Sequence, residues 1–148
     1  MQMKNSVLCV SSCGGHFKQI IDITQNICTC QKTFVVNDYV KTVKNQRLIQ
    51  ITHAERNLKQ IINFYEAYKI IKREKPKLIL STGASPAVVF CIVGKLFKVP
   101  TVYVESFSRV TSLSLTGRIM RYLADEFIVQ WPTLQKKYPN AQYYGNLL

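Results

Sequence analysis

Short apolar runs alternate with longer segments of helical periodicity along the whole chain. Strands separated by helices of this length pair through right-handed crossovers, which gives a parallel sheet with helices on both faces. The pattern therefore predicts an α/β fold with a Rossmann-like, doubly wound parallel sheet. Strands are expected at residues 7–10, 33–36, 48–52, 78–80, 101–104, 127–130 and 142–144, and helices at 17–24, 57–75, 87–97, 115–124 and 133–138.

The pattern over residues 57–75 predicts the clearest helix. Its apolar positions recur at the i, i+3, i+4, i+7 spacing, and Pro76 ends it because proline cannot continue a helix. The basic residues of the same segment are expected to form a solvated outer face. The apolar positions are Leu58, Ile61, Ile62, Tyr65 and Tyr68, and the basic ones are Lys59, Lys69, Lys72, Arg73 and Lys75.

Length and composition predict one globular domain over residues 1–148. A chain of 148 residues, of which 47% are hydrophobic, is long enough to bury a core. Residues 1–5 lead directly into a strand, so we expect no secretory signal. The longest apolar stretch, residues 87–94, is far shorter than the ~20 residues that span a bilayer, so we expect contact with a membrane surface but no crossing.

The chain is strongly basic, with a formal net charge of +12. Such an excess favours an anionic partner, which is nucleic acid, an anionic membrane face or a phosphorylated substrate. A basic nucleic-acid-binding module without catalysis is one alternative, but no such motif is present and the aromatic residues occupy positions typical of a core. Arg118 and Arg121, with Tyr122, form either ordinary helix surface or a membrane-facing patch.

The cysteines are odd in number and scattered, which favours reduced thiols over a disulfide framework. The spacing of Cys28 and Cys30 does not match a zinc-binding pair, and no second Cys or His pair accompanies it. We therefore expect neither a metal site nor a cofactor. The five cysteines are Cys9, Cys13, Cys28, Cys30 and Cys91.

The first apolar run ends in Ser12-Cys13-Gly14-Gly15-His16, and a helical pattern follows. A strand that turns into a helix at two glycines points several backbone N–H groups at one spot, which with the helix dipole favours phosphate binding. The loop is neither the dinucleotide fingerprint nor a Walker loop, because the third glycine and the Gly-Lys-Ser/Thr are missing. His16 is either a structural residue of the loop or a general base.

A second loop of small residues, Ser81 to Pro86, follows the strand at 78–80. Pro86 fits the first turn of a helix capped by Ser85. Because the carboxyl ends of parallel strands meet at one edge of a sheet, both loops are expected to face one crevice and form a bipartite phosphate site. The second loop contributes Thr82, Gly83, Ala84 and Ser85 to this site.

Glu105 ends another buried strand and is one of only 8 acidic residues in the chain. It is either a structural carboxylate bonded to nearby backbone N–H groups or a residue of the same crevice. Ser106 follows it, and Arg109 is close enough along the chain to pair with Glu105 or to bind a phosphate as a forked donor.

Four motifs together resemble one family, the PssD-type capsular and exopolysaccharide biosynthesis proteins. These are bacterial relatives of the membrane-anchor subunit of the eukaryotic dolichol-linked N-acetylglucosaminyltransferase. More distantly, the chain resembles the amino-terminal half of the lipid-linked N-acetylglucosaminyltransferase of peptidoglycan synthesis, a two-domain GT-B enzyme. The motifs are Ser12-Cys13-Gly14-Gly15-His16, Ser81-Thr82-Gly83-Ala84-Ser85-Pro86, the stretch from Val104-Glu105-Ser106 through Arg109-Val110 to Ser114-Leu115-Thr116-Gly117, and the finish from Ala124-Asp125 through Val129-Gln130-Trp131 to Tyr144-Gly145.

The resemblance implies one half of a split GT-B glycosyltransferase. This chain would be the acceptor-binding, membrane-associated subunit, and a separate small partner would hold the UDP-sugar in a heterodimer. The implied reaction is an inverting sugar transfer to an undecaprenyl-diphosphate-linked saccharide at the cytoplasmic membrane face, in capsule or exopolysaccharide synthesis. The eukaryotic subunit has an amino-terminal membrane span, which this chain lacks, so membrane contact is expected through basic residues and an apolar patch.

The resemblance also implies roles for the motif residues. Gly14 and Gly15 would approach the acceptor diphosphate, His16 would take the proton of the acceptor hydroxyl, and Glu105 would orient the acceptor sugar or the partner's donor site. A stand-alone nucleotide-sugar-binding enzyme is a further alternative. The other expected acceptor or diphosphate contacts are Ser12, Cys13, Thr82, Gly83, Ala84, Ser85, Ser106 and Arg109.

Overall fold

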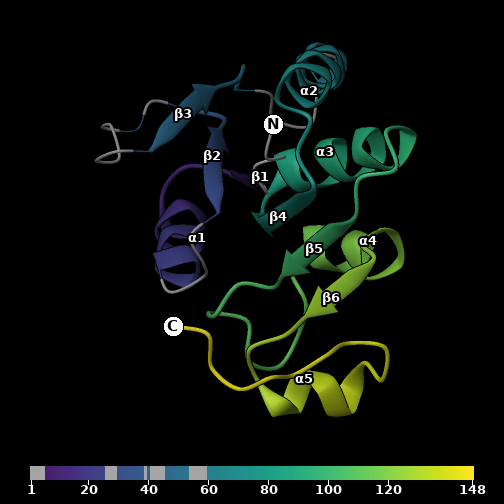
Figure 1. Cartoon of the computed structure of the whole chain (residues 1–148). Coiled ribbons are helices and arrows are strands. Elements are labelled where there is room, and N and C mark those ends of the chain that lie inside the picture. Colours follow the sequence, from purple (N-terminus) through teal and green to yellow (C-terminus); the bar gives the residue numbers. More distant parts are fainter. Residues whose placement is uncertain (1–5, 26–29, 39, 41–45, 54–59) are drawn as a thin grey trace.

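The computed structural model describes residues 6–25, 30–38, 40, 46–53 and 60–148. They form six strands and five helices in alternation, apart from two consecutive strands, β2 and β3 (Figure 1). The strands are β1 (Ser6–Ser11), β2 (Gln31–Val36), β3 (Arg47–Gln50), β4 (Leu78–Gly83), β5 (Thr101–Val104) and β6 (Glu126–Ile128). The helices are α1 (Gly15–Gln25), α2 (Gln60–Glu74), α3 (Ser85–Leu96), α4 (Leu115–Leu123) and α5 (Pro132–Lys137).

The strands form one sheet in the order β3-β2-β1-β4-β5-β6, and every neighbouring pair is parallel. This is the doubly wound order, in which the chain reverses direction across the sheet between β1 and β4. The predicted fold class is therefore confirmed. Ligands of such sheets bind outside the carboxyl ends of the strands at this switch point.

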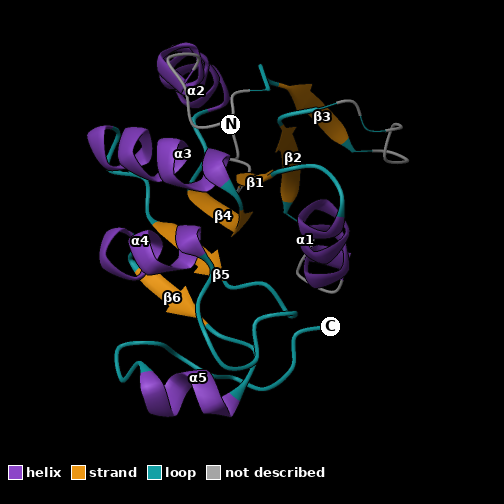
Figure 2. Cartoon of the chain, turned by 180° about the vertical axis from the view of Figure 1, so that it is seen from behind, coloured by secondary structure: helices purple, strands orange, loops and turns teal. Residues whose placement is uncertain are grey.

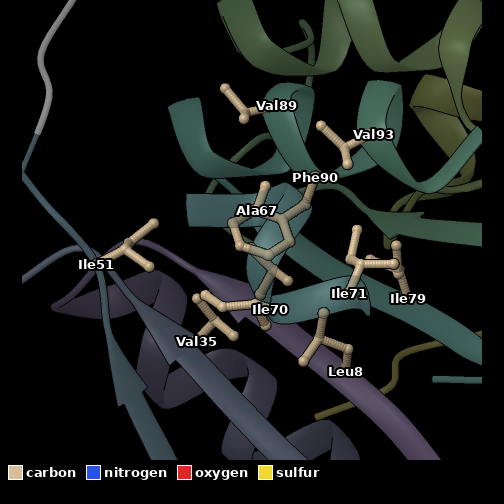
Figure 3. Close-up of a cluster of buried hydrophobic side chains, with 11 residues drawn as sticks. Leu8, Val35, Ile51, Ala67, Ile70, Ile71, Ile79, Val89, Phe90 and Val93 are labelled. Atoms are coloured by element: carbon tan, nitrogen blue, oxygen red, sulfur yellow. The ribbon is translucent and has the colours of Figure 1, made fainter. Parts of the chain in front are cut away.

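Helices cover the two faces of the sheet unequally (Figure 2). On one face, α1 buries Phe17, Ile20 and Ile23 against β1, β2 and β4. On the other face lie α2 and α3, whose apolar side chains close over Leu8, Val35 and Ile79 of the strands (Figure 3). The same face continues into α4 and α5, where Tyr103 and Phe127 stack with ring centroids 5.5 Å apart.

Most predicted elements agree with the structure, but the last predicted strand, residues 142–144, is wrong. Only Gln142 pairs there, through one parallel bridge to Ile128. Its N–H donates to Phe127 O and its carbonyl accepts from Val129 N–H, both at 2.8 Å. The side chains beyond it include the exposed Tyr144, so no buried face holds the segment in strand pairing.

The apolar stripe predicted on α2 is not its buried face. Residues 57–59, including Leu58 and Lys59, lie outside the described residues, while Ile61 is 68% and Tyr65 59% exposed. The helix has apolar residues on most of its circumference, so periodicity identifies the helix without identifying the face that is buried. The buried positions are Asn63, Ala67, Ile70 and Ile71, and the exposed large ones are Ile61, Ile62, Phe64, Tyr65 and Tyr68.

Hydrogen bonds explain why the Asn63 face of α2 turns inward. Glu66 accepts from the N–H of Thr52 at 3.0 Å and from its hydroxyl at 2.9 Å. The side-chain amide of Asn63, with its nitrogen toward the carbonyl, donates to Thr52 O at 2.9 Å. These bonds hold the helix to the segment after β3, because a buried amide left without partners is costly.

Of the described cysteines, Cys9, Cys13 and Cys91 are free, and burial raises the pKa of the Cys9 thiol to about 12. Cys30 lies in a disulfide, so the prediction of reduced thiols is wrong for this residue. A count and scatter of cysteines cannot show which pairs come close enough in the fold to bond. Across the described parts of the chain, no helix combines the length and apolar character that crossing a bilayer requires.

Candidate functional site

The loops after β1 and β4 lie side by side at the switch point and bond to each other. Ser12 N–H donates to Gly83 O at 2.7 Å, and Ala84 N–H donates to the Ser12 hydroxyl at 3.3 Å. The Thr82 hydroxyl donates to His16 O at 2.8 Å. The structure thus brings together the two loops that the sequence places in one bipartite site.

Two glycines of these loops have backbone angles that favour glycine. Gly14 has φ +78° and Gly83 has φ +106°, both in the left-handed region that side chains disfavour. Gly14 and Gly15 are exposed at the start of α1, where the first backbone N–H groups have no carbonyl of the same helix to bond. An anionic ligand can therefore come close to the backbone N–H groups at Gly14 and Gly15.

Helix α3 begins two residues earlier than the predicted 87–97, and its N-cap lies one residue before the predicted Ser85. Its N-cap is Ala84, whose side chain accepts no hydrogen bond, and Ser85 is the first helical residue. Pro86 lies in the first turn, as predicted. The α3 amino terminus therefore lacks a side-chain cap at the edge of the same crevice.

His16 lies on the first turn of α1, with its ring against Gly83. A Cβ added to Gly83 would lie 3.2 Å from Cε1 and 3.3 Å from Nδ1 of the ring. The Nδ1 atom is buried and has no hydrogen-bond partner among the described residues. An unpartnered ring nitrogen at the switch point leaves His16 able to bond an ordered water or a ligand.

The Tyr103 hydroxyl reaches the same place from β5 and was not predicted from the sequence. It would lie 3.4 Å from the added Gly83 Cβ, and it too is buried without a partner in the described structure. Burial, followed by the negative charge of Glu105, raises the pKa of the Tyr103 phenol above its ordinary value. In the sequence, Tyr103 is indistinguishable from the other buried residues of an apolar strand.

Glu105 follows β5, is 0% exposed, and is fully engaged by the start of α4. Its carboxylate accepts from Ser106 N–H at 2.8 Å, from Ser114 N–H at 3.0 Å and from the Ser114 hydroxyl at 2.9 Å. Ser114 is the N-cap of α4 and accepts from Gly117 N–H at 2.9 Å. This geometry fits the structural interpretation of Glu105, in which the carboxylate bonds to nearby backbone N–H groups.

Two buried glutamines, also absent from the predicted site, hold the backbone around Glu105. The side-chain amides of Gln19 and Gln130 donate to Glu105 O at 3.1 and 3.2 Å. Gln19 also accepts from Phe107 N–H at 3.3 Å, so it links α1 to the loop before α4. Gln19 carries no sequence signal, whereas Gln130 belongs to the Val129-Gln130-Trp131 motif.

The remaining predicted residues lie in the loops that follow β1 and β5. Cys13 N–H donates to the side chain of Asn37 at 3.1 Å, so this amide is not available to a phosphate. The Ser106 hydroxyl lies 3.0 Å from that of Ser108. Arg109 is exposed in the loop before α4, and in the described structure it forms no ion pair with Glu105.

The site contains no obvious metal ligands. In residues 6–25, 30–38, 40, 46–53 and 60–148, no group of three or more His, Cys, Asp or Glu could hold a metal ion. The arrangement therefore offers an imidazole, glycine backbone N–H groups and small hydroxyls. These groups can accept a proton and bind an anion.

Several known proteins with similar sequences are UDP-N-acetylglucosamine transferase subunits named ALG14. The chain is 34% identical over 116 residues to the human UDP-N-acetylglucosamine transferase subunit ALG14, covering 74% of this chain and 54% of that protein. It is 31% identical over 123 residues to the Yarrowia lipolytica protein of the same name, covering 79% and 57%. The chain thus spans about half the length of these relatives.

Solved structures with a similar fold are GT-B-like glycosyltransferases and epimerases. MurG from Acinetobacter baumannii matches with a TM-score of 0.71 and 15% identity, over 87% of this chain and 42% of that chain. S. aureus MnaA, solved with UDP, matches with a TM-score of 0.70 and 13% identity, over 97% and 45%. At such low identities these likenesses show the fold alone.

The family model described as "Oligosaccharide biosynthesis protein Alg14 like" matches residues 30–147, which is most of the chain. The match includes the β4 loop, Glu105 and the N-cap of α4, and it begins after the β1 loop. On this evidence, together with the relatives, the chain belongs to the Alg14-like family of oligosaccharide biosynthesis proteins.

Proposed function

We propose that this chain is the acceptor-binding subunit of a two-component glycosyltransferase, in which a separate partner holds a UDP-sugar. The acceptor is an undecaprenyl-diphosphate-linked saccharide, and the context is the capsule or exopolysaccharide synthesis of the PssD-type proteins. Two observations support the proposal: the family, and the word "subunit" in the names of the relatives.

The observation that carries the proposal is the position of His16 at the switch point. Its ring lies between the two strand-end loops, whose glycines and helix starts are suited to a diphosphate. In the proposed reaction His16 takes the proton of the acceptor hydroxyl as that oxygen attacks the anomeric carbon. The bond from that carbon to UDP breaks on the opposite side, so the configuration inverts.

The division of labour is tested with the purified chain and a separately purified donor-binding glycosyltransferase as its candidate partner. Sugar transfer to an undecaprenyl-diphosphate-linked monosaccharide is measured with each protein alone and with both. We expect turnover only when both are present. Full activity of this chain alone, or calorimetric binding of the UDP-sugar to it alone, would instead support a stand-alone enzyme.

The proposed base is tested with His16→Ala in the complete complex, with His53→Ala as the matched control on the other histidine. Loss of a general base lowers turnover by about 10²- to 10⁴-fold. We expect such a loss for His16→Ala and turnover near that of the wild type for His53→Ala. Unchanged turnover of His16→Ala would reduce His16 to a structural residue of the loop.

For membrane association we propose the exposed stripe of α4. Leu115, Ile119 and Tyr122 are 50%, 44% and 71% exposed, and their spacing places them on one side of the helix. Arg118 and Arg121 lie beside them on the same helix. Exposed apolar side chains next to basic ones are the combination that binds an anionic membrane surface. Because Glu105 bonds the N-cap of α4, this contact would hold the crevice next to the lipid-linked acceptor.

The α4 stripe is tested by flotation with vesicles that contain anionic or only neutral lipids. We expect binding to anionic vesicles that falls with added salt, and a clear loss for Ile119→Asp. The matched control is Ile61→Asp, which makes the same change at the exposed start of α2. Binding to generic RNA or DNA, without binding to vesicles, would favour the nucleic-acid module instead.

A further inference from the structure

The strongest unexplained feature of the crevice is a pair of buried polar atoms that meet at Gly83. His16 belongs to α1, on one face of the sheet, whereas Tyr103 packs with Phe127 on the other face. Gly83 has no side chain between them, and a Cβ there would lie 3.3 Å from His16 Nδ1 and 3.4 Å from the Tyr103 hydroxyl. The sum of these two distances limits the separation of the polar atoms to 6.7 Å.

Both atoms are buried without a hydrogen-bond partner in the described structure. A buried polar group left unsatisfied is costly, so native proteins pair such groups directly or through an ordered water. One bridging water, with about 3 Å on each side, joins polar atoms up to about 6 Å apart, which covers most of the range that this limit allows. A side chain at residue 83 would occupy the place where these two groups converge.

We propose that Tyr103 is a positioning residue for His16, holding its Nδ1–H through one bridging water at Gly83. This inference rests on the proposed function, in which His16 is the base. With the proton fixed on Nδ1, the other ring nitrogen, Nε2, is unprotonated and can accept the proton of the acceptor hydroxyl. In this bridge Nδ1–H donates a hydrogen bond to the water, and the water donates one to the Tyr103 oxygen.

Glu105 influences the Tyr103 end of this bridge. Its buried negative charge acts on the phenol strongly enough to raise the pKa of Tyr103, after burial itself. The charge favours the hydroxyl rotamer that points its proton toward the carboxylate, which leaves the oxygen lone pairs for the water.

The first test is the ring tautomer of His16, observed by NMR in the ¹⁵N-labelled full chain. The chain contains only 2 histidines, so His53 serves as the internal reference. We expect His16 in the Nδ1–H form in the wild type, and a shift toward the Nε2–H form in Tyr103→Phe with His53 unchanged. An Nε2–H tautomer in the wild type, or no change in the variant, would overturn the proposal.

The second test is the kinetics of Tyr103→Phe in the complete complex, with Tyr144→Phe as the control tyrosine. Loss of an outer hydrogen-bond partner lowers activity by about 10- to 100-fold at other sites. We expect this loss in kcat with KM for the acceptor within about twofold, together with a shifted acid limb of the pH profile. A proportionate rise in KM with unchanged kcat would contradict positioning of the base.

Failure of the proposed function and failure of this inference give different results. If His16→Ala retains turnover while the tautomer still responds to Tyr103→Phe, the link between the residues exists but His16 is not the base. If His16→Ala loses turnover and the tautomer does not respond, His16 is the base and another group positions it. Removal of the Tyr103 hydroxyl leaves the stacked ring in place, so circular dichroism is expected to show a folded variant.

Discussion

The two titratable groups at the carboxyl edge of the sheet, His16 and Glu105, have opposite surroundings. The Glu105 carboxylate is buried and accepts hydrogen bonds from Ser106 and Ser114. The His16 ring is partly exposed beside Gly83, and its Nδ1 is buried without a partner in the described chain. We call the first region the Glu105 cap and the second the His16 centre.

The difference contrasts a carboxylate whose partners all belong to the chain with a ring nitrogen that has no partner in the described chain. Every donor around Glu105 belongs to the chain itself, so the Glu105 cap is complete without any other molecule. In the His16 centre the buried Nδ1 atom has no hydrogen-bond partner in the described chain. Buried polar atoms without partners are rare in native proteins and often lie at functional sites. Mutations in the cap are therefore expected to change stability, and mutations in the centre to change activity.

The largest expected effect is that of Gly117→Ala on stability. A Cβ at residue 117 would lie 1.8 Å from Glu105 Oε2 and 2.9 Å from its Cδ. The carboxylate cannot move aside without losing the bonds that Ser106 and Ser114 donate to it. We expect a loss of about 3 kcal/mol or more in the free energy of unfolding, measured by urea denaturation.

The control for this change is Gly15→Ala, because a Cβ at residue 15 would contact nothing within 4 Å. This variant is expected to unfold at nearly the same urea concentration as the wild type. Equal loss of stability in both variants would show that α1 and α4 simply tolerate alanine poorly at their amino termini. It would remove the close approach of Gly117 to Glu105 as the explanation.

Glu105→Gln is expected to have the next largest effect on stability. The amide nitrogen of the glutamine would face the N–H group of Ser106 or Ser114. Two hydrogen-bond donors would then face each other where a charged acceptor now bonds to that N–H group. We expect a loss of about 2 kcal/mol in the free energy of unfolding. His16→Gln, the matched change in the His16 centre, is expected to leave the thermal stability nearly unaltered. A larger loss of stability for His16→Gln than for Glu105→Gln would contradict the assignment of stability to the Glu105 cap.

The alternation of strands and helices and the carboxyl-edge rule were enough to predict the sheet and the meeting of the two loops. Both depend on local pattern and on the geometry common to parallel sheets. The hydrogen bonds of Glu105 could not be predicted in the same way, because its partner Ser114 lies nine residues away across an irregular loop. The sequence therefore left its structural and functional interpretations open.

Side-chain direction was the information that the sequence lacked. Tyr103 lies in an apolar strand, where nothing in the pattern shows that its hydroxyl ends beside Gly83. On α2, Tyr65 and Tyr68 occupy regular helical positions, yet both are exposed, with Lys69 and Lys72 over their rings at 4.4 and 5.5 Å. The argument that aromatic residues occupy core positions, used against a nucleic-acid module, is wrong for these tyrosines.

Gly83→Ala is expected to damage the His16 centre more than the fold. The added methyl would fill the space between the His16 ring and the Tyr103 hydroxyl, at 3.2 to 3.4 Å from their atoms. The positive φ also costs about 1 kcal/mol or more for alanine. We expect turnover of the complete complex to fall by about tenfold or more, as for the loss of other outer partners of a catalytic group.

Gly145→Ala provides the matched control for Gly83→Ala. Gly145 has a comparable φ of +94°, but a Cβ there would contact nothing within 4 Å. The control therefore has the backbone strain without the contact, and it is expected to lose some stability but no turnover. Similar turnover in the two variants would show that filling the space beside His16 has no catalytic consequence.

The smallest expected effect is a pH dependence of stability that arises where the two regions meet, at Tyr103. Its folded-state pKa is raised by burial and by Glu105, so the folded state holds this proton more tightly than the unfolded state does. The associated stability is complete below the unfolded pKa of about 10 and is lost as the pH rises above it. The slope for one such group is at most about 1.4 kcal/mol per pH unit.

Tyr103→Phe removes this group while the burial of Cys9, whose pKa is also raised, stays the same in both proteins. The free energy of unfolding of the wild type is therefore expected to fall more steeply than that of Tyr103→Phe from about pH 10 upward, in urea titrations at successive pH values. Parallel curves would mean that the Tyr103 phenol ionises as easily in the folded chain as in the unfolded one. Glu105 would then exert no influence on Tyr103, and the two regions would be independent despite their proximity.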